Sequence, residues 1–417
     1  MSKFRRVMCF LLSVVAFACL LPVPGAAQEI ALASEAAVLM DAESGQILYG
    51  KNMDSTMYPA SITKVLTGLL ALKYGKETDK VTMTQAGVSQ VPRTSSHIAL
   101  EPGEAFTMKD ALYALALVSA NDAAVAIAET VSGSVEDFAK LMNEEAEKLG
   151  AYNSHFVNPN GMPNQDHYTT ARDMALITAE ALKQEGFLTY FGAKSYEMPA
   201  TNLSAARPLV SKNQFIDGTF DCPGLLMSKT GWTSSALGTL VTAVKRGDTT
   251  LIAVTLKSPM LEDKYTDTLA LLDYGFANYR RVRLSQKLME RKMVAQGMDE
   301  DCSLEGYTPQ DVLIPQTAGE ADIAVTVPGG FDSSLGVSTV PASVDVKQED
   351  GTWVHVTDLL LTIRDPEPEV EALAETEGAE AAAEPEAKAI HPGAAILLGL
   401  AVVFFLFRFI GKRKITA

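Results

Sequence analysis

Ser61 and Lys64 stand three residues apart in a run that begins at Pro59 and has the features of a helix start. Residues at positions i and i+3 lie side by side on one helix face. A serine hydroxyl becomes a strong nucleophile when a neighbour takes its proton, and a lysine does so when burial and nearby positive charge lower its pKa. The pair predicts a serine nucleophile with a lysine general base. The same Ser-x-x-Lys pattern also occurs in a capped helix with a surface lysine, so the choice between these two interpretations depends on other residues.

A second hydroxyl and an amide occur at Ser119 and Asn121, between two apolar helical runs. In such a place Ser119 could pass a proton to a leaving amine, and Asn121 could hold a substrate backbone. Ser211 and Asn213 repeat the Ser-x-Asn pattern, but no pair of helical runs flanks them. We therefore assign the proton-transfer role to Ser119.

The third group is Lys229-Thr230-Gly231, which opens a strand-like stretch. The lysine and threonine side chains can bind a substrate carboxylate, and the glycine allows close backbone approach. The order Ser-x-x-Lys, Ser-x-Asn, Lys-Thr-Gly along one chain is the signature of serine penicillin-binding enzymes. The three groups together predict an acyl-transfer site that opens an amide bond.

Longer runs carry a more specific resemblance. They are residues 59–64 (PASITK), 119–124 (SANDAA), 158–161 (NPNG) and 274–276 (YGF). With them, residues 36–276 resemble the low-molecular-mass penicillin-binding proteins, the serine-type D-alanyl-D-alanine carboxypeptidases of peptidase family S11. The resemblance implies an α/β (α+β) domain of the transpeptidase and β-lactamase type, with an antiparallel sheet and helices, that works without a cofactor in cell-wall synthesis.

The resemblance also implies roles for single residues. Ser61 would attack the last peptide bond of the peptidoglycan stem peptide, Lys64 would take its proton, and Ser119 would pass a proton to the departing D-alanine. The backbone N–H groups of Ser61 and Trp232 would form the oxyanion hole. The remaining substrate contacts would come from Asn121, Lys229 and Thr230, and the same site would be acylated by β-lactams.

The chain departs from the family pattern at two positions. An arginine that helps to bind the carboxylate is replaced by Lys264, which keeps the charge but loses the bidentate fork. The family's Ala-Gly pair after the Lys-Thr-Gly strand begins is here Ala236-Leu237. These changes bear on carboxylate recognition and on the local strand geometry, and they remove no reacting group.

Three other functions share these motifs. A β-lactamase needs a glutamate-activated water, and no Glu-x-x-Leu-Asn segment follows Ser119. A D,D-endopeptidase that cuts cross-links would use the same residues. An inactive wall-binding scaffold would keep the fold without turnover. The carboxypeptidase interpretation is preferred to the scaffold because every reacting side chain is present, and to the β-lactamase because a membrane anchor and an extra β domain suit a wall-processing enzyme. The motifs leave the endopeptidase open.

The elements that must position these residues follow from hydrophobic periodicity. Residues 36–40 and 46–49 predict a β-hairpin, and residues 108–150 and 170–182 predict helices. Strands are expected at 237–244 and 251–256. After about residue 280, Val, Thr and Ile with frequent turns predict a small all-β domain.

The two ends of the chain predict export and anchoring. Residues 1–27 have the charged start, apolar run and small residues of a signal peptide. The expected order is then a catalytic domain (28–278), a β-rich domain (279–364), an acidic Ala/Glu/Pro linker (365–389), a transmembrane helix (390–411) and a basic cytoplasmic tail (412–417). The enzyme would face the cell wall from the outer side of the cytoplasmic membrane.

Charge and composition exclude other classes. The formal net charge is −16, and about half of it lies in the linker, so there is no basic surface for nucleic acid. The five histidines show no metal-binding spacing, and we expect no metal. Two cysteines follow the signal, Cys222 and Cys302, in separate predicted domains. Two buried thiols are the preferred interpretation, with a disulfide as the alternative.

Overall fold

A computed structural model describes residues 30–300, 302–328, 337–348 and 351–364. Up to residue 278 its elements are β1 (Ala36–Asp41), β2 (Ile47–Lys51), the 3-10 turn η1 (Ala60–Thr63), α2 (Lys64–Tyr74), β3 (Lys80–Thr82), α3 (Gln85–Ser89), β4 (Ala105–Thr107), α4 (Met108–Leu117), α5 (Asn121–Ser132), α6 (Val135–Lys148), α7 (Ala171–Lys183), α8 (Phe187–Phe191), β5 (Ser195–Met198), β6 (Arg207–Val210), β7 (Leu225–Thr233), β8 (Leu237–Arg246), β9 (Thr249–Ser258) and α9 (Asp263–Asn278). The hairpin, the helices and the two strands expected from the sequence are all present.

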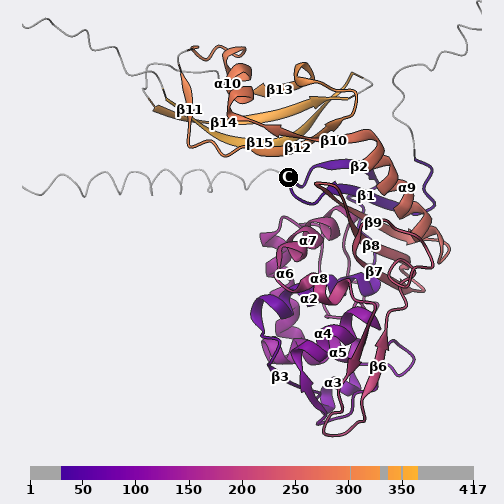
Figure 1. Ribbon diagram of the computed structural model, residues 1–417. Coiled ribbons are helices and arrows are strands. Elements are labelled where there is room, and N and C mark those ends of the chain that lie inside the picture. The colour runs from indigo at the N-terminus through magenta and orange to yellow at the C-terminus, as the bar shows by residue number, and fades with distance from the viewer. Residues whose placement is uncertain (1–29, 301, 329–336, 349–350, 365–417) are drawn as a thin grey trace, which may run out of the picture. The chain divides into compact units, whose positions relative to one another are not determined.

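The central sheet has five strands in the order β2-β1-β9-β8-β7, and every neighbouring pair is antiparallel. Its N-terminal hairpin joins the later strands because β1 pairs with β9, with Ala36 opposite Leu256. Helix α9 packs on one face and α7 on the other (Figure 1). Strand β1 is therefore buried along its whole length, whereas β7 stands at an edge of the sheet.

Helix α2 runs through the middle of the helical layer. Its residues from Lys64 to Ala71 are all buried, because α4, α5 and α7 pack around it. A helix that is apolar on nearly every side is stable only in such surroundings. The hydrophobic core around it includes Leu66, Leu70, Leu115, Ile127, Phe138 and Phe156. The start of α2, which carries the predicted nucleophile, is thus held from several directions.

Helix caps define the other helix starts. Thr107 accepts a hydrogen bond from the Asp110 backbone at the start of α4, and the Asp110 side chain completes a capping box. Thr170 caps α7 in the same way by accepting from the Asp173 backbone. These caps fix the first residues of α4 and α7, whereas α5 and α9 begin without a side-chain cap.

The elements after residue 278 are β10 (Tyr279–Leu284), α10 (Gln286–Val294), β11 (Ser303–Glu305), β12 (Gln310–Pro315), the 3-10 turn η2 (Glu320–Asp322), β13 (Ile323–Thr326), β14 (Val337–Lys347) and β15 (Trp353–Arg364). Four of the strands form a sheet in the order β11-β15-β14-β13, and β10 pairs with β12. Helix α10 was not expected from the sequence. This region is β-rich as predicted, with a hydrophobic cluster built on residues such as Leu288, Val312, Val344 and Leu361.

Several predictions fall outside the described residues. The signal peptide (1–27), the linker (365–389), the transmembrane helix (390–411) and the tail (412–417) all lie there. Within the described ranges, no helix is both long and apolar enough to cross a membrane. The boundary at residues 278 and 279 stays a prediction. Cys222 and Cys302 are both buried and belong to separate hydrophobic clusters.

Candidate active site

Ser61 lies on the 3-10 turn η1, directly before α2, and not within an ordinary α-helical turn as the sequence suggested. The preceding Ala60 has a φ of 51°, in the left-handed region that residues with a Cβ seldom adopt. A loop packs so closely here that a Cβ on Gly161 would collide with the Ala60 carbonyl. Strained backbone of this kind persists where the surrounding packing enforces it, and it gathers at active sites.

The amine of Lys64 makes three short polar contacts. Its Nζ lies 2.9 Å from Ser61 Oγ, 2.7 Å from Asn121 Oδ1 and 2.6 Å from the backbone carbonyl oxygen of Asn160. The Lys64 side chain has no exposed surface. The structure therefore brings the predicted nucleophile, its predicted base and Asn121 into one hydrogen-bonded group.

Burial is the main cause of an altered pKa at Lys64. Loss of solvent, followed by the positive charge of Lys229, lowers the pKa of Lys64 well below its ordinary value, and the carboxylate of Asp122 acts in the opposite direction. Burial and the positive charge of Lys229 disfavour the charged form of the Lys64 amine, and the negative charge of Asp122 favours it. A lysine with a lowered pKa has a larger neutral fraction near pH 7, and only the neutral amine can take a proton.

Ser119 stands at the junction of α4 and α5. Its φ is 58°, a second left-handed residue that is not glycine. Its Oγ accepts a hydrogen bond from Lys229 Nζ at 3.0 Å, while Asn121, two residues on, opens α5. The junction between α4 and α5 therefore brings the Ser119 hydroxyl to Lys229 and the Asn121 amide oxygen to Lys64.

Lys229, Thr230 and Gly231 lie in the second half of β7, not at its start as expected. Lys229 Nζ donates to Ser119 Oγ and, at 2.8 Å, to the Thr230 carbonyl oxygen. Burial, and then the charge of Lys264, lowers the pKa of Lys229 to about 7. Both Lys229 and Thr230 line the open pocket, and Lys229 is the more deeply buried of the two.

Gly231 allows β7 to pass close to the nucleophile. A Cβ at this position would lie 2.8 Å from the Ser61 backbone nitrogen, which is too close for any side chain. Behind this contact, Thr239 of β8 donates a hydrogen bond to the Pro59 carbonyl oxygen at 2.9 Å. The Ser61 turn and the strand that leads to Trp232 are therefore held at backbone distance, as an oxyanion hole made of their N–H groups requires.

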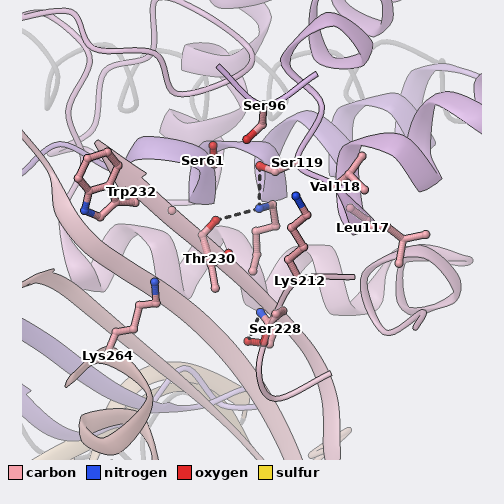
Figure 2. A pocket seen from close by; sticks show the side chains of 14 residues that line it. Ser61, Ser96, Leu117, Val118, Ser119, Lys212, Ser228, Thr230, Trp232 and Lys264 are labelled. Carbon is pink, nitrogen blue, oxygen red and sulfur yellow. Dashed lines mark hydrogen bonds between the residues drawn. The ribbon is translucent and has the colours of Figure 1, made fainter. Parts of the chain in front are cut away.

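Lys264 comes from the first turn of α9 and reaches the same pocket (Figure 2). It is buried, and burial lowers its pKa. Its Nζ lies 5.3 Å from the centre of the Tyr265 ring, and no carboxylate of the described residues pairs with it. A buried ammonium without a protein anion is suited to an anion supplied by a ligand.

Leu237 occupies the position where the family pattern has glycine. Its φ is 54°, so the left-handed conformation is retained although the residue has a side chain. This conformation costs a residue with a Cβ about 1–2 kcal/mol. Leu237 therefore introduces local backbone strain at the start of β8.

The open space between these residues has a volume of about 280 Å³. Figure 2 shows Ser61, Ser119 and Thr230 around this space, with Lys264 and Trp232 on one side and Lys212 on the other. No aspartate or glutamate lines it. Lysines are thus the charged side chains that line the pocket, a lining that suits a small anionic group.

Sequence reasoning missed several residues at this site. The Asn160 carbonyl contacts Lys64, and Ser96, Lys212 and Asn213 line the pocket. Asn213 belongs to the Ser-x-Asn run that was set aside, and its amide donates to Ser228 Oγ at 3.0 Å. A backbone carbonyl has no signature in a sequence, so only the family-like run at 158–161 could have pointed to Asn160.

The described residues contain no group of three His, Cys, Asp or Glu side chains that could hold a metal ion. His167 is buried beside the site and bonded to protein atoms on both nitrogens.

Comparisons with known proteins agree on one family. A family model described as D-alanyl-D-alanine carboxypeptidase, peptidase S11, matches residues 24–260. The D-alanyl-D-alanine carboxypeptidase DacF of Bacillus subtilis is 37% identical over 256 residues, which is 60% of this chain and 64% of that protein. DacA of Haemophilus influenzae is 31% identical over 289 residues, 67% of this chain and 71% of that protein.

Solved structures show the same fold. Penicillin-binding protein 5 from Haemophilus influenzae superposes with a TM-score of 0.66 at 24% identity, over 82% of this chain and 99% of that one. A D-alanyl-D-alanine carboxypeptidase from Mycobacterium tuberculosis gives a TM-score of 0.56 at 29% identity, over 61% and 95% of the two chains. The longer of these matches extends beyond the central sheet and its helices.

Proposed function

Because the chain belongs to the D-alanyl-D-alanine carboxypeptidases of peptidase family S11, we propose that it removes the terminal D-alanine of peptidoglycan stem peptides through an acyl-enzyme on Ser61. The chain matches about two thirds of the length of the first relatives, 64% and 71%. The observation that carries the proposal is the contact of 2.9 Å between the buried Lys64 amine and the Ser61 hydroxyl.

The surroundings of Lys64 support a direction for the first proton transfer. A neutral amine has two N–H bonds and one lone pair. The two carbonyl oxygens at 2.7 and 2.6 Å, on Asn121 and Asn160, use both N–H bonds. The lone pair is then directed at Ser61 Oγ, so the serine donates its proton to Lys64 as the oxygen attacks.

In the acylation step Ser61 Oγ bonds to the carbonyl carbon of the penultimate D-alanine, and negative charge develops on the carbonyl oxygen. The backbone N–H groups of Ser61 and Trp232 would stabilise that charge. The C–N bond then breaks, and the amine of the departing D-alanine takes a proton through Ser119, which is hydrogen-bonded to Lys229. Water attacks the ester in the second step, and Ser61 recovers its proton.

The carboxylate of the terminal D-alanine would bind among Lys229, Thr230 and Lys264. Of the two lysine amines, that of Lys229 is hydrogen-bonded to Ser119 and Thr230, whereas no hydrogen bond or ion pair joins Lys264 Nζ to a described residue, and its charge is poorly solvated. A ligand carboxylate would supply the missing counter-charge. A β-lactam, which carries an equivalent acid group, would enter in the same orientation and acylate Ser61.

The proposal is tested by measuring D-alanine release from a stem pentapeptide with the full chain, with Ser61→Ala as control. We expect release by the native protein only, together with a stable penicilloyl adduct on Ser61. Fast repeated turnover of penicillin would show a β-lactamase. No release by either protein would show a scaffold. Faster cleavage of cross-linked than of monomeric muropeptides would show an endopeptidase.

We also propose that the enzyme is exported and held at the outer face of the cytoplasmic membrane by residues 390–411. The support is the apolar run followed by a basic end, and the charged and apolar start of the chain. Cell fractionation with and without residues 390–417 tests this. Membrane-bound activity in the full chain and released activity in the truncated chain are expected, and equal distribution would contradict the anchor.

A further inference from the structure

Residues 158–162 form a loop that packs against the start of α2, where Lys64 lies. The Asn160 carbonyl accepts from Lys64 at 2.6 Å, and the Pro159 carbonyl accepts from Thr67, one turn later on α2, at 2.5 Å. Two consecutive carbonyls therefore face the buried side of the same helix. The position of this loop decides whether Lys64 has one carbonyl partner or two.

His167 connects this loop to the turn that carries the nucleophile. Its Nδ1 accepts the Val157 N–H at 3.1 Å, so the ring proton is on Nε2, which donates to Thr63 Oγ1 at 2.9 Å. Val157 directly precedes the loop, and Thr63 directly precedes Lys64. The ring is 1% exposed and packs edge-on against Phe156.

This histidine keeps one charge state. Burial, with smaller effects from the charges of His155 and Lys64, lowers the pKa of His167 to about 3. A doubly protonated ring would donate from both nitrogens and would lose the bond from Val157. His167 is therefore a fixed neutral link and does not act as an acid or base at working pH.

We propose that His167 is a positioning residue that holds the Asn160 carbonyl against Lys64 and so directs the amine lone pair at Ser61. The inference rests on the proposed function, because it assigns Lys64 the role of base. It predicts that His167 affects the rate of acylation more than the affinity for substrate, since the ring lies behind the turn and does not line the pocket.

Two substitutions distinguish the hydrogen bonds of His167 from the packing of its ring. His167→Leu removes both hydrogen bonds, and His167→Gln keeps a donor near the place of Nε2. We expect His167→Leu to lower the rate of Ser61 acylation by a β-lactam about 10–100-fold, because small displacements of reacting groups cost that much. KM for D-alanine release should stay within about twofold, and His167→Gln should recover most of the rate.

The pH dependence gives a readout that general loosening would not produce. Lys64 has Lys229 and Asp122 as its charged neighbours, and both stay in place. A carbonyl acceptor favours the charged amine, so its loss lowers the pKa of Lys64 further. His167→Leu should therefore move the acid limb of the acylation profile to lower pH while the plateau rate falls, and NMR titration of Lys64 should show the same shift.

His155 supplies the matched control. It lies on the same segment, is partly exposed, and its Nδ1 bonds to the Asp166 carbonyl at 2.5 Å without reaching Thr63. His155→Gln should leave the acylation rate within about twofold. Thr63→Val should reproduce the effect of His167→Leu, and the double variant should add little because both changes break one link.

An unchanged acylation rate per folded His167→Leu molecule, or an effect on KM alone, would overturn the inference. Circular dichroism and thermal unfolding supply the folded fraction. A native protein that is acylated but releases no D-alanine would contradict the proposed substrate and leave the inference intact. If the native protein is not acylated at all, the Lys64 titration still decides, because an unshifted pKa in His167→Leu contradicts the link.

Discussion

The central sheet with its helices and the β-rich region bury different kinds of side chain. Residues up to 278 bury many polar groups, including Lys64, Lys229 and Lys264. In the described residues from 279 to 364 the buried side chains are almost all apolar, with Arg281, whose side chain is 6% exposed and ion-paired with Asp41, as an exception. Removing a charge from water costs several kcal/mol, so a region keeps buried cations only where another gain offsets that cost. We therefore place the proposed chemistry in the first region and expect the core of the second to contribute stability.

Backbone strain follows the same division. The described non-glycine residues with positive φ are Asn52, Ala60, Ala99, Ser119, Leu237 and Lys257, all in the first region. Two of them are the proposed proton shuttle and the residue before the proposed nucleophile. Strain of about 1–3 kcal/mol per residue is stored where the surroundings enforce it. We therefore expect core substitutions to separate activity from stability in the first region and to change only stability in the second.

The largest effect is expected at Lys64. Lys64→Met should lower the rate of penicilloyl formation by about 10³-fold or more, because general-base catalysis contributes up to about 10⁴-fold. Its thermal stability should stay close to that of the native protein, because an apolar chain of similar length removes the cost of desolvating the amine while the Asn121 and Asn160 oxygens lose their donor. Rapid-mixing acylation and calorimetry measure the two. If Lys64→Met lost activity because it unfolded, activity and stability would not be separable in the first region, and the contrast with the second region would fail.

The opposite pattern is expected at Leu361, which is 1% exposed in the core of the β-rich region. Leu361→Ala should lower the free energy of unfolding of that region by about 2–5 kcal/mol. Acylation of Ser61 should remain within about twofold. Hydrogen exchange of the β14 and β15 amides measures the first effect. The neighbouring Leu360 is 74% exposed, so Leu360→Ala is the control with almost no change.

A smaller effect is expected at Lys264, which affects binding and not the reacting bond. Lys264→Ala should raise KM about 10-fold or more, because a charge-assisted contact contributes roughly 1.5–3 kcal/mol. Lys264→Arg should keep or lower KM, since the guanidinium restores the bidentate fork. Steady-state kinetics measure this. A substrate with a C-terminal amide should be insensitive to both changes, and equal sensitivity would place the carboxylate elsewhere.

The last effect is a dependence of stability on pH. The pKa of Lys229 is about 7 when folded and near 10.5 when unfolded, so between these values the unfolded chain binds more protons. Stability of the first region should therefore rise as pH rises from 7 to 10, with a slope from this group on the order of 1 kcal/mol per pH unit. Lys229→Met should reduce the slope by the share of this one group, while Lys64 and Lys264, whose pKa values are also lowered, keep the rest. Urea unfolding at several pH values tests it, and an unchanged slope in Lys229→Met would contradict the assignment.

The sequence predicted the elements that have strong periodicity or turn chemistry. The hairpin of β1 and β2, the helical stretch that contains α4, α5 and α6, and the strands β8 and β9 were all expected, because their apolar residues repeat at the period of a helix or a strand. Two details were wrong. Ser61 lies on a 3-10 turn, and the Lys-Thr-Gly run lies inside β7, because packing against Gly161 and Thr239 decided the local backbone. Helix α10 was missed because its few buried residues, such as Leu288 and Met293, form a weak pattern.

The sequence by itself determined which side chains are available. The order of Ser61, Lys64, Ser119, Asn121, Lys229 and Thr230 follows from the letters alone, and so does the exchange that places Lys264 where the family has arginine. The tertiary structure decided what these groups become. Burial lowers the pKa of Lys64, the Asn160 carbonyl takes one of its N–H bonds, and His167 links that loop to the nucleophile's turn. Desolvation and backbone contacts depend on segments far apart in the chain, so no local pattern of residues specifies them.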